Sequence, residues 1–371
     1  MAARRWIAAA SAVLLSCAAG EVPARAQSST AFPMGGLTTA PGTRTSGTLT
    51  VPGGAGDTGT IIPFTVIHGT RPGPVLALIA GTHGVEYPPV LALQRLRASI
   101  DPRALAGTVV LVHMANMPSF LARTIYYGPK DGQNLNRVFP GRRDGTLSER
   151  IAFVITAEII DRATHVIDIH CGDGNEWLRP YSYWVVTGAP PVVAASKDLA
   201  LAFGLDHIVI DTERPSDPAA SVYLANTAMT RGKPALTAES GGWSRTDEES
   251  IARIERGVAG VLKHLGMRAD GPDPVAHPVW LGRNEVLRSG FTGLLFPQVE
   301  PGQTVAQGTL IARVTDFHGT LLEEIRAPFA GEILYVVATP PITKGEPVGF
   351  VAERVAAPPA LPSSPPRRGG R

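Results

Sequence analysis

An α/β fold, in which helices cover both faces of a largely parallel sheet, is predicted for most of the chain, followed by a small all-β module. Unbroken apolar runs recur, as in residues 74–81 (PVLALIAG) and 107–116 (GTVVLVHMAN), which is the pattern of strands buried on both faces. Segments with helical periodicity separate these runs, as in a parallel sheet. After residue 278 short apolar stretches with frequent glycines replace the helical segments, which predicts the all-β module.

Each predicted element follows from its local pattern. Residues 46–51 and 61–69 form early strands around a glycine-rich turn, and Leu91, Leu93 and Leu96 predict a helix after the strand at 74–81. In chain order the other elements are a strand at 107–116, a helix at 148–160 capped by Ser148, strands at 164–172, 206–211 and 233–242, and a helix at 247–266 that ends at Gly266.

The chain is expected to divide into five segments. A polar, proline-containing break at 267–278 separates the two folded parts, and the last residues are rich in Pro, Arg and Gly. The predicted segments are a signal peptide (1–26), a lead-in rich in small residues (27–47), the α/β domain (48–267), the all-β module (276–355) and a disordered tail (356–371).

The first segment has the pattern of an export signal. Two arginines precede an apolar stretch that runs to about Gly20, and Ala-Arg-Ala at 24–26 offers a small-x-small cleavage site. The apolar stretch is short for a bilayer span. We therefore expect an exported protein, periplasmic or secreted. Residues 14–17 (LLSC) resemble a lipobox, which leaves a lipid anchor at Cys17 as the alternative.

Composition argues against a nucleic-acid partner and against an internal disulfide bond. Hydrophobic residues make up 44% of the 371 residues, and the net charge of +2 comes without a long basic run in the folded part. No nucleic-acid partner is expected. Cleavage would remove Cys17, so Cys171 would remain alone and no internal disulfide is predicted.

Four polar residues lie where predicted strands end, and functional groups collect at this edge of open α/β sheets. They are His83, Glu86, His170 and Glu239. Two imidazoles and a carboxylate, with a fourth position for water, form the usual three-ligand catalytic zinc site. A further carboxylate is then needed as general base. Taken alone, the His-x-x-Glu pair is also compatible with a turn histidine and a solvated carboxylate at a helix start.

Four sequence blocks in order resemble the succinylglutamate desuccinylase/aspartoacylase family, a branch of the zinc carboxypeptidase superfamily. The blocks are GTHGVEY (81–87), DGQNLNRVFPG (131–141), DIHCGD (168–173) and TAESGG (237–242). The resemblance implies a mixed, mostly parallel sheet flanked by helices. It also implies one Zn²⁺ per chain, bound by His83, Glu86 and His170.

The resemblance assigns further roles around the metal. Asn136 and Arg137 match an Asn-Arg pair that binds the carboxylate of the substrate, and a guanidinium suits this task because it meets a carboxylate in a bidentate fork. Glu239 matches the general base. Arg123 is the nearest candidate for an arginine that polarises the scissile carbonyl.

Three more residues are candidates from their sequence positions alone. Arg179 and Tyr181 follow the His170 loop and are expected to line the pocket. Asp168 is a candidate neighbour of the metal site, but we expect strand alternation to turn it to the face opposite His170.

The all-β module resembles the biotinyl/lipoyl hammerhead, on the half-repeats at 300–314 and 325–336. A carrier of that type needs a lysine at its hairpin, and residues 315–319 (TDFHG) contain none. We expect the module to pack on the α/β domain or to narrow access to its site.

These observations predict an exported zinc-dependent deacylase. It would cleave the acyl group from an N-acylated small molecule that carries a carboxylate, by zinc-activated water with Glu239 as base. A carboxypeptidase on peptides or cell-wall peptides and an esterase stay open, since the same site serves both. A non-catalytic binding protein is disfavoured because all four mechanistic positions hold competent residues. The oligomeric state stays open.

Overall fold

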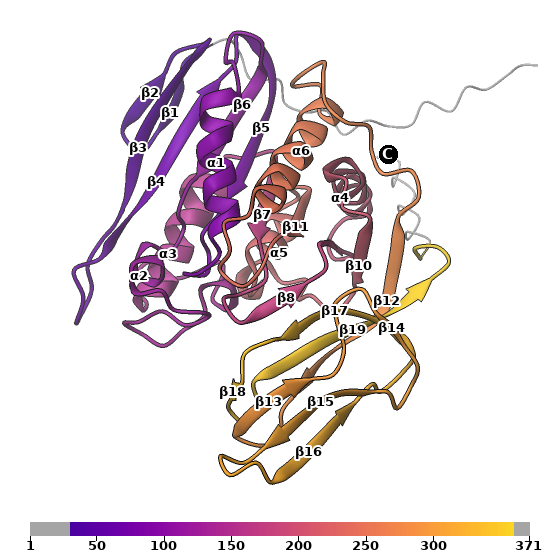
Figure 1. Cartoon of the computed structure of the whole chain (residues 1–371). Coiled ribbons are helices and arrows are strands. Elements are labelled where there is room, and N and C mark those ends of the chain that lie inside the picture. The colour runs from indigo at the N-terminus through magenta and orange to yellow at the C-terminus, as the bar shows by residue number, and fades with distance from the viewer. Residues whose placement is uncertain (1–29, 360–371) are drawn as a thin grey trace, which may run out of the picture.

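The computed structural model describes residues 30–359 (Figure 1). Its strands before the C-terminal module are β1 (Phe32–Met34), β2 (Leu37–Thr39), β3 (Thr43–Val51), β4 (Thr60–His68), β5 (Arg71–Ile79), β6 (Ala106–Val112), β7 (His165–His170), β8 (Glu176–Leu178), β9 (Tyr181–Val185), β10 (His207–Asp211) and β11 (Ala235–Glu239). Its helices are α1 (Tyr87–Ser99), α2 (Met117–Ala122), α3 (Leu147–Ile155), α4 (Pro190–Phe203), α5 (Leu224–Thr230) and α6 (Glu248–His264), with short helical segments η1 (Leu135–Arg137), η2 (Thr156–Ile160) and η3 (Pro218–Ala220).

The described chain after α6 forms strands without a further helix. They are β12 (Val279–Arg288), β13 (Gly293–Pro297), β14 (Thr304–Val305), β15 (Leu310–Thr315), β16 (Leu321–Arg326), β17 (Gly331–Val337), β18 (Pro341–Ile342) and β19 (Pro347–Val355). They form the orange and yellow module at one end of the molecule (Figure 1).

A single long sheet runs through both parts of the protein. Its strand order is β14-β17-β19-β12-β10-β9-β11-β7-β5-β6-β4-β3, with β8 paired to β17. The strands β6, β5, β7 and β11 are mutually parallel, so β5, β7 and β11 end at the same edge. The strand β9 runs antiparallel to β11, and its first residue, Tyr181, therefore starts at that edge. This edge carries the candidate site.

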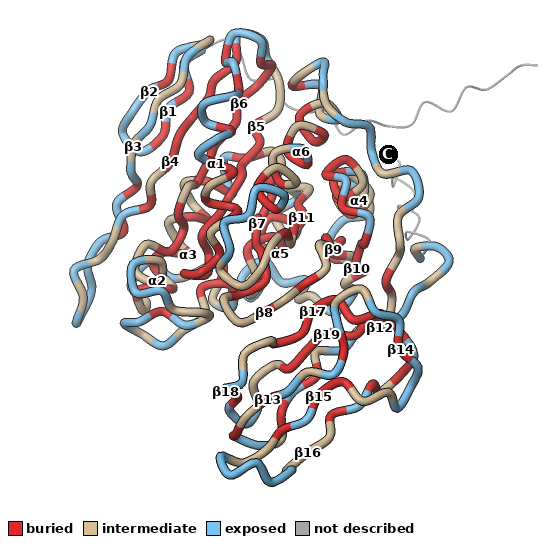
Figure 2. The backbone as a smooth tube through the Cα atoms, in the orientation of Figure 1, coloured by how far each residue is buried: buried red, intermediate tan, exposed pale blue. Residues whose placement is uncertain are grey.

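Helices bury both faces of the central strands. Leu93 of α1 and Ile254 of α6 pack with Leu78 of β5 in one apolar cluster. Ile151 of α3 and Leu224 of α5 belong to a second cluster, which also contains residues of β5 and β7. Most residues of the central strands are accordingly buried (Figure 2), as their unbroken apolar sequences predict.

The C-terminal module has its own core but is joined to the main sheet. The strands β16-β15-β13-β18 form a separate sheet, which packs with β17 and β19 around Ile311 and Ile333. The strand β12 continues the main sheet, because it pairs in parallel with β10, with Leu281 opposite Val209. The predicted fold class, an α/β sheet flanked by helices and followed by an all-β module, is confirmed.

Several local predictions need correction. The lead-in expected up to residue 47 contains β1, β2 and the start of β3. Thr146, rather than Ser148, caps α3, because its hydroxyl accepts a hydrogen bond from the Glu149 amide while the Glu149 side chain accepts one from the Thr146 amide. Ser148 instead donates a hydrogen bond to Asp131 at 3.0 Å.

Three predictions concern residues that the structure does not fully describe. The signal peptide at 1–26 and the lipobox cysteine, Cys17, lie outside the described residues, as does most of the tail at 356–371. Within residues 30–359, no helix has the length and apolar character needed to cross a bilayer.

Candidate metal and catalytic site

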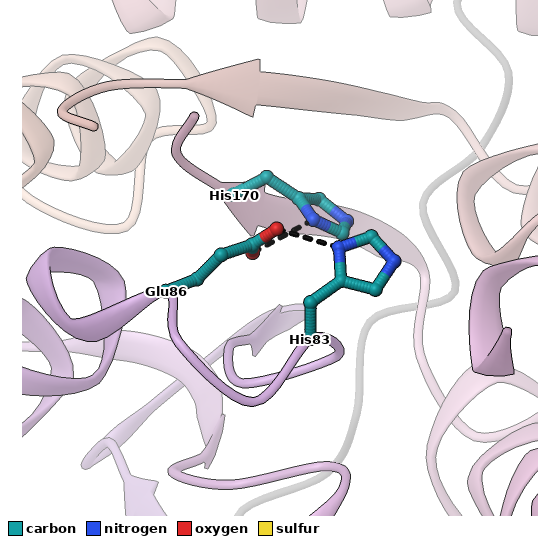
Figure 3. Close-up of side chains that lie close together, drawn as sticks. All are labelled: His83, Glu86 and His170. Carbon is teal, nitrogen blue, oxygen red and sulfur yellow. Dashed lines mark hydrogen bonds and ion pairs between the residues drawn. The ribbon is translucent and has the colours of Figure 1, made fainter. Parts of the chain in front are cut away.

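Three predicted ligands converge at the carboxyl edge of the sheet. His83 and Glu86 lie in the loop between β5 and α1, and His170 is the last residue of β7. His83 Nδ1 lies 2.6 Å from one Glu86 oxygen, and His170 Nδ1 lies 2.9 Å from the other. One ligand atom from each residue lies within 4.8 Å of the others (Figure 3). All three side chains are almost fully buried.

The loop that carries His83 and Glu86 is shaped by its glycines. Gly81 has a φ of 73°, and a Cβ there would lie 2.5 Å from the Met114 sulfur. A Cβ on Gly84 would lie 2.2 Å from the Ser119 carbonyl oxygen. Only glycine therefore lets the loop pack this closely against the segment before and within α2.

The far nitrogens of both histidines face oxygen atoms. His83 Nε2 lies 3.1 Å from Oδ1 of Asn134, and His170 Nε2 lies 3.0 Å from Oδ1 of Asp168. These partners favour a proton on Nε2, which leaves Nδ1 to bind a metal. The expectation that Asp168 faces away from His170 was wrong, because residues two apart in a strand point to the same face.

The electrostatics of this triad keep the carboxylate ionised. Burial alone would raise the pKa of Glu86, but the neighbouring His170 and His83 lower it to about 2. Burial alone would also lower the pKa of His170, but Asp168 and Glu86 raise it well above its ordinary value. With a metal ion bound, both imidazoles would be neutral. The metal ion would then supply the positive charge that balances the Glu86 carboxylate.

The donor set fits a zinc ion. Two imidazole nitrogens with oriented tautomers and one ionised carboxylate match the three protein ligands of catalytic zinc sites, which leave one position open. The three residues line a cavity of about 190 Å³, so that position faces a space that admits a small molecule. The residues of the chain thus fit the group that the sequence predicts.

Glu239 lies beside this triad. It ends β11 and pairs in register with His170 on the parallel strand β7. Glu239 is half-buried and lines the same cavity. Burial raises the pKa of Glu239 well above its ordinary value; the nearby Glu86 and Glu176 carboxylates raise it further, whereas His170 opposes them. A carboxylate whose pKa is raised accepts a proton more readily than an ordinary carboxylate does, which suits a general base.

The Asn-Arg pair has two different surroundings. The Asn136 amide is buried, donating a hydrogen bond to Asp168 at 3.3 Å and accepting one from the Leu224 amide at 2.8 Å. These bonds make Asn136 a link between the metal site and α5. Arg137 is exposed, lines the cavity and stacks on Tyr223, with its Cζ 4.6 Å from the ring centroid. Both residues line the cavity, but only Arg137 brings a charged group to it.

Two arginines do not lie where the sequence predicted. Arg123 caps α2 in a left-handed conformation, with a φ of 55°, and it is exposed and not among the residues that line the cavity. Its placement does not support the expected carbonyl-polarising role. Arg179 is also outside the cavity and pairs with Asp206 at 2.7 Å. Tyr181, by contrast, lines the cavity as expected.

The cavity contains residues that sequence reasoning missed. Arg214 stacks on Tyr223 with 3.6 Å between Cζ and the ring centroid, and forms an ion pair with Asp211. Arg288 and Tyr335 come from the C-terminal module, which thereby forms part of the cavity wall. Asp173 and Glu176 follow His170 closely, which was the one signal available in the sequence.

Comparisons with known proteins agree with this architecture. The family model of the succinylglutamate desuccinylase/aspartoacylase catalytic domain matches residues 72–265. The chain is 32% identical, over 304 residues, to the N-alpha-acetyl-L-2,4-diaminobutyric acid deacetylase of Halomonas elongata, covering 80% of this chain and 86% of that protein.

Two solved structures are similar over almost their whole length. A succinylglutamate desuccinylase/aspartoacylase from Rhodobacter sphaeroides has a TM-score of 0.74 at 26% identity and covers 85% of this chain and 96% of its own. A product-bound ectoine utilization protein from Ruegeria pomeroyi has a TM-score of 0.74 at 29% identity, with 84% and 95% covered.

Proposed function

The chain belongs to the succinylglutamate desuccinylase/aspartoacylase family, and from this membership and its site geometry we propose that it is a zinc-dependent deacylase of N-acylated amino acids. The reaction is the hydrolysis of an amide, which releases a carboxylic acid and an amine. The Halomonas elongata relative is named for the removal of an acetyl group from an acylated diamino acid, which makes such compounds the first substrates to test.

One observation carries the proposal. His83, Glu86 and His170 bring two Nδ1 atoms and a carboxylate to one point, and Glu239 stands on the neighbouring strand beside His170. Metal-assisted amide hydrolysis requires a metal site and a separate acid-base group, and this cavity contains three candidate metal ligands and a further carboxylate.

The positions of the side chains support the roles proposed for them. When bound, zinc would polarise the acyl carbonyl and make water more acidic. Glu239 would take the proton of the attacking water and return it to the leaving nitrogen. Asp168 and Asn134 hold the two imidazoles in orientation. Arg137 and Arg214, which both stack on Tyr223, would bind the carboxylate of the substrate.

The size of the cavity favours a small substrate. Its volume of about 190 Å³ lies below the roughly 300–1,000 Å³ of pockets for drug-sized ligands. An N-acyl amino acid is a better match for this space than a peptide or a cell-wall fragment. Residues from the C-terminal module, including Arg288 and Tyr335, limit the space on one side.

Export is part of the proposal and is supported by the N-terminal sequence alone. The basic start, the apolar stretch and the Ala-Arg-Ala at 24–26 follow the order of a cleaved signal. Expression of the full chain, followed by N-terminal sequencing of protein from the culture medium, the periplasm and the membranes, tests it. An intact N-terminus in the cytoplasm would refute export, and a processed protein beginning at Cys17 would establish the lipid anchor.

A substrate panel on zinc-analysed protein tests the activity. We expect about one zinc per chain and faster hydrolysis of N-acetyl amino acids than of short peptides or of the matching acetyl esters. Preference for the peptides would make the protein a carboxypeptidase, and preference for the esters an esterase. A zinc-loaded protein that hydrolyses none of the three classes would contradict the proposal.

A further inference from the structure

A second pair of carboxylates lies beside the metal triad and has no part in the mechanism above. Asp173 and Glu176 line the same cavity, and their residues are only 5% and 8% exposed. Asp173 Oδ1 lies 3.9 Å from His83 Nδ1. Among the described residues, this oxygen is buried and has no hydrogen-bond donor. A buried carboxylate oxygen without a donor is costly unless a ligand supplies one.

The segment that carries this pair is held in place from three directions. Within the turn, the Glu176 amide donates to the Asp173 carbonyl at 2.9 Å, and the Asp173 amide donates to a Glu176 carboxylate oxygen at 3.2 Å. The Tyr126 hydroxyl donates to the other Glu176 oxygen at 3.0 Å. Glu176 also starts β8, which pairs with β17 of the C-terminal module. The Glu176 carboxylate and the backbone of Asp173 are therefore held in position before any ligand arrives.

The charges of the cavity are arranged for a substrate with two kinds of charge. Arg137 and Arg214 gather around Tyr223, where they suit a carboxylate. Asp173 lies near His83, in the cavity that Glu176 also lines, and these carboxylates suit a cation. An acylated amino acid with a neutral side chain would use the arginines and leave Asp173 Oδ1 without a hydrogen-bond donor.

We propose that Asp173, supported by Glu176, binds the side-chain ammonium group of the substrate, so that the enzyme selects N-acylated diamino acids over neutral ones. This inference rests on the proposed deacylase function and specifies its substrate class. An ammonium group supplies the donors that Asp173 Oδ1 lacks, and a charged hydrogen bond in a buried site discriminates strongly against an analogue without it.

A matched pair of substrates tests this selectivity. N-alpha-acetyl-L-2,4-diaminobutyrate carries the ammonium group, and N-acetyl-L-norvaline carries a methyl group in the same place. For the wild type we expect kcat/KM to favour the charged substrate by about 10- to 100-fold. Asp173→Asn keeps the shape but removes the charge, so this ratio should fall at least about 10-fold. Glu353→Gln, which removes an exposed charge outside the cavity, should leave the ratio as it is.

A binding measurement separates this inference from the deacylase proposal. Calorimetry on the zinc-loaded protein compares the free products L-2,4-diaminobutyrate and L-norvaline. If the diamino acid binds more tightly and Asp173→Asn abolishes the difference, the ammonium site stands even if no amide is hydrolysed. If neutral N-acetyl amino acids are hydrolysed but the charged and neutral ligands are not distinguished, the deacylase stands and the ammonium site is overturned.

Two other results would also overturn it. An equal loss of kcat on both substrates in Asp173→Asn would place Asp173 in the hydrolytic step itself. A second equivalent of metal in the wild type that disappears in Asp173→Asn would make the acidic pair a metal site. Should Asp173→Asn fail to fold, as judged by circular dichroism, Glu176→Gln provides the same comparison, and an unchanged selectivity ratio in that variant contradicts the proposal.

Discussion

Glu239 stands directly beside His170, as its register partner on the neighbouring parallel strand. The two residues are distant in the sequence, yet the sheet places a candidate base next to a candidate metal ligand, about 4.8 Å from strand to strand. Both β7 and β11 lie inside the sheet, with a paired strand on each side. The roles of metal ligand and general base can therefore be tested separately, by substitution of a ligand and of Glu239.

Removal of a ligand should abolish metal binding. In His83→Ala, one of the three donors is lost and the buried Glu86 loses its 2.6 Å partner. We expect the zinc content measured by elemental analysis to fall from about one per chain to near zero, together with activity. A variant that lost the metal and kept full activity would refute the mechanism. Circular dichroism distinguishes loss of metal from loss of fold.

Removal of the base should leave the metal in place. Glu239→Gln preserves the shape of the side chain and alters none of the three ligands. We expect unchanged zinc content and a decrease in kcat of about 10²- to 10⁴-fold, the usual contribution of a positioned acid-base group. Glu285→Gln, on the exposed side of β12, serves as the control. Rapid turnover by the Glu239 variant would move the base to another residue.

Substitution of two arginines tests which of them binds the carboxylate of the substrate. Arg214 stacks on Tyr223 and lines the cavity, so Arg214→Lys should raise KM for carboxylate-bearing substrates by about 10-fold, because an ammonium cannot reproduce the bidentate fork. Arg123→Lys, at an exposed position outside the cavity lining, should change neither kcat nor KM. A large loss of kcat in Arg123→Lys would restore the role that the sequence suggested for it.

The junction between the two parts of the protein should be sensitive to pH. His207 on β10 lies 3.0 Å from Glu332 on β17, and both side chains are almost fully buried. Burial alone would lower the pKa of His207, but Asp206 and Glu332 raise it above its ordinary value. A raised folded-state pKa means that this stabilisation is complete below the unfolded-state pKa of about 6.5. It is lost as the pH rises through the folded-state value.

Thermal unfolding measures this effect. The melting temperature of the wild type should decrease between about pH 6 and pH 9 by more than that of His207→Gln, which lacks the titrating group. Glu332→Gln removes one partner of the buried pair and should cost about 3–5 kcal/mol in the free energy of unfolding. Equal pH dependence in the wild type and in His207→Gln would show that this pair does not set the response.

Local patterns were sufficient for most of the fold and for the ligand set. Buried strands have unbroken apolar sequences, so β5, β6 and β7 were predicted close to their observed positions. The strands β8 and β9 were not, because residues 176–185 are interrupted by Arg179 and Pro180 and alternate without a clear apolar face. Their existence depends on pairing with β17, β10 and β11, which no local window contains.

The cavity wall was the part that the sequence could not supply. Arg214 follows β10, and Arg288 and Tyr335 lie in the C-terminal module, so none has a motif that marks it as a site residue. Arg123 was chosen because it precedes the Asn-Arg pair in sequence. The structure places Arg123 at the exposed C-terminal cap of α2, outside the residues that line the cavity.

The ligand types, their order along the chain and their places at strand ends could be predicted, since these depend on residue chemistry and on periodicity within single segments. Which side chains share the cavity could not be predicted in this way. That outcome depends on the order of strands in the sheet, on the register that sets Glu239 beside His170, and on the joining of the C-terminal module to the sheet through β12. Each is a pairing between distant segments, whose free energy is distributed over many contacts and leaves no local signature.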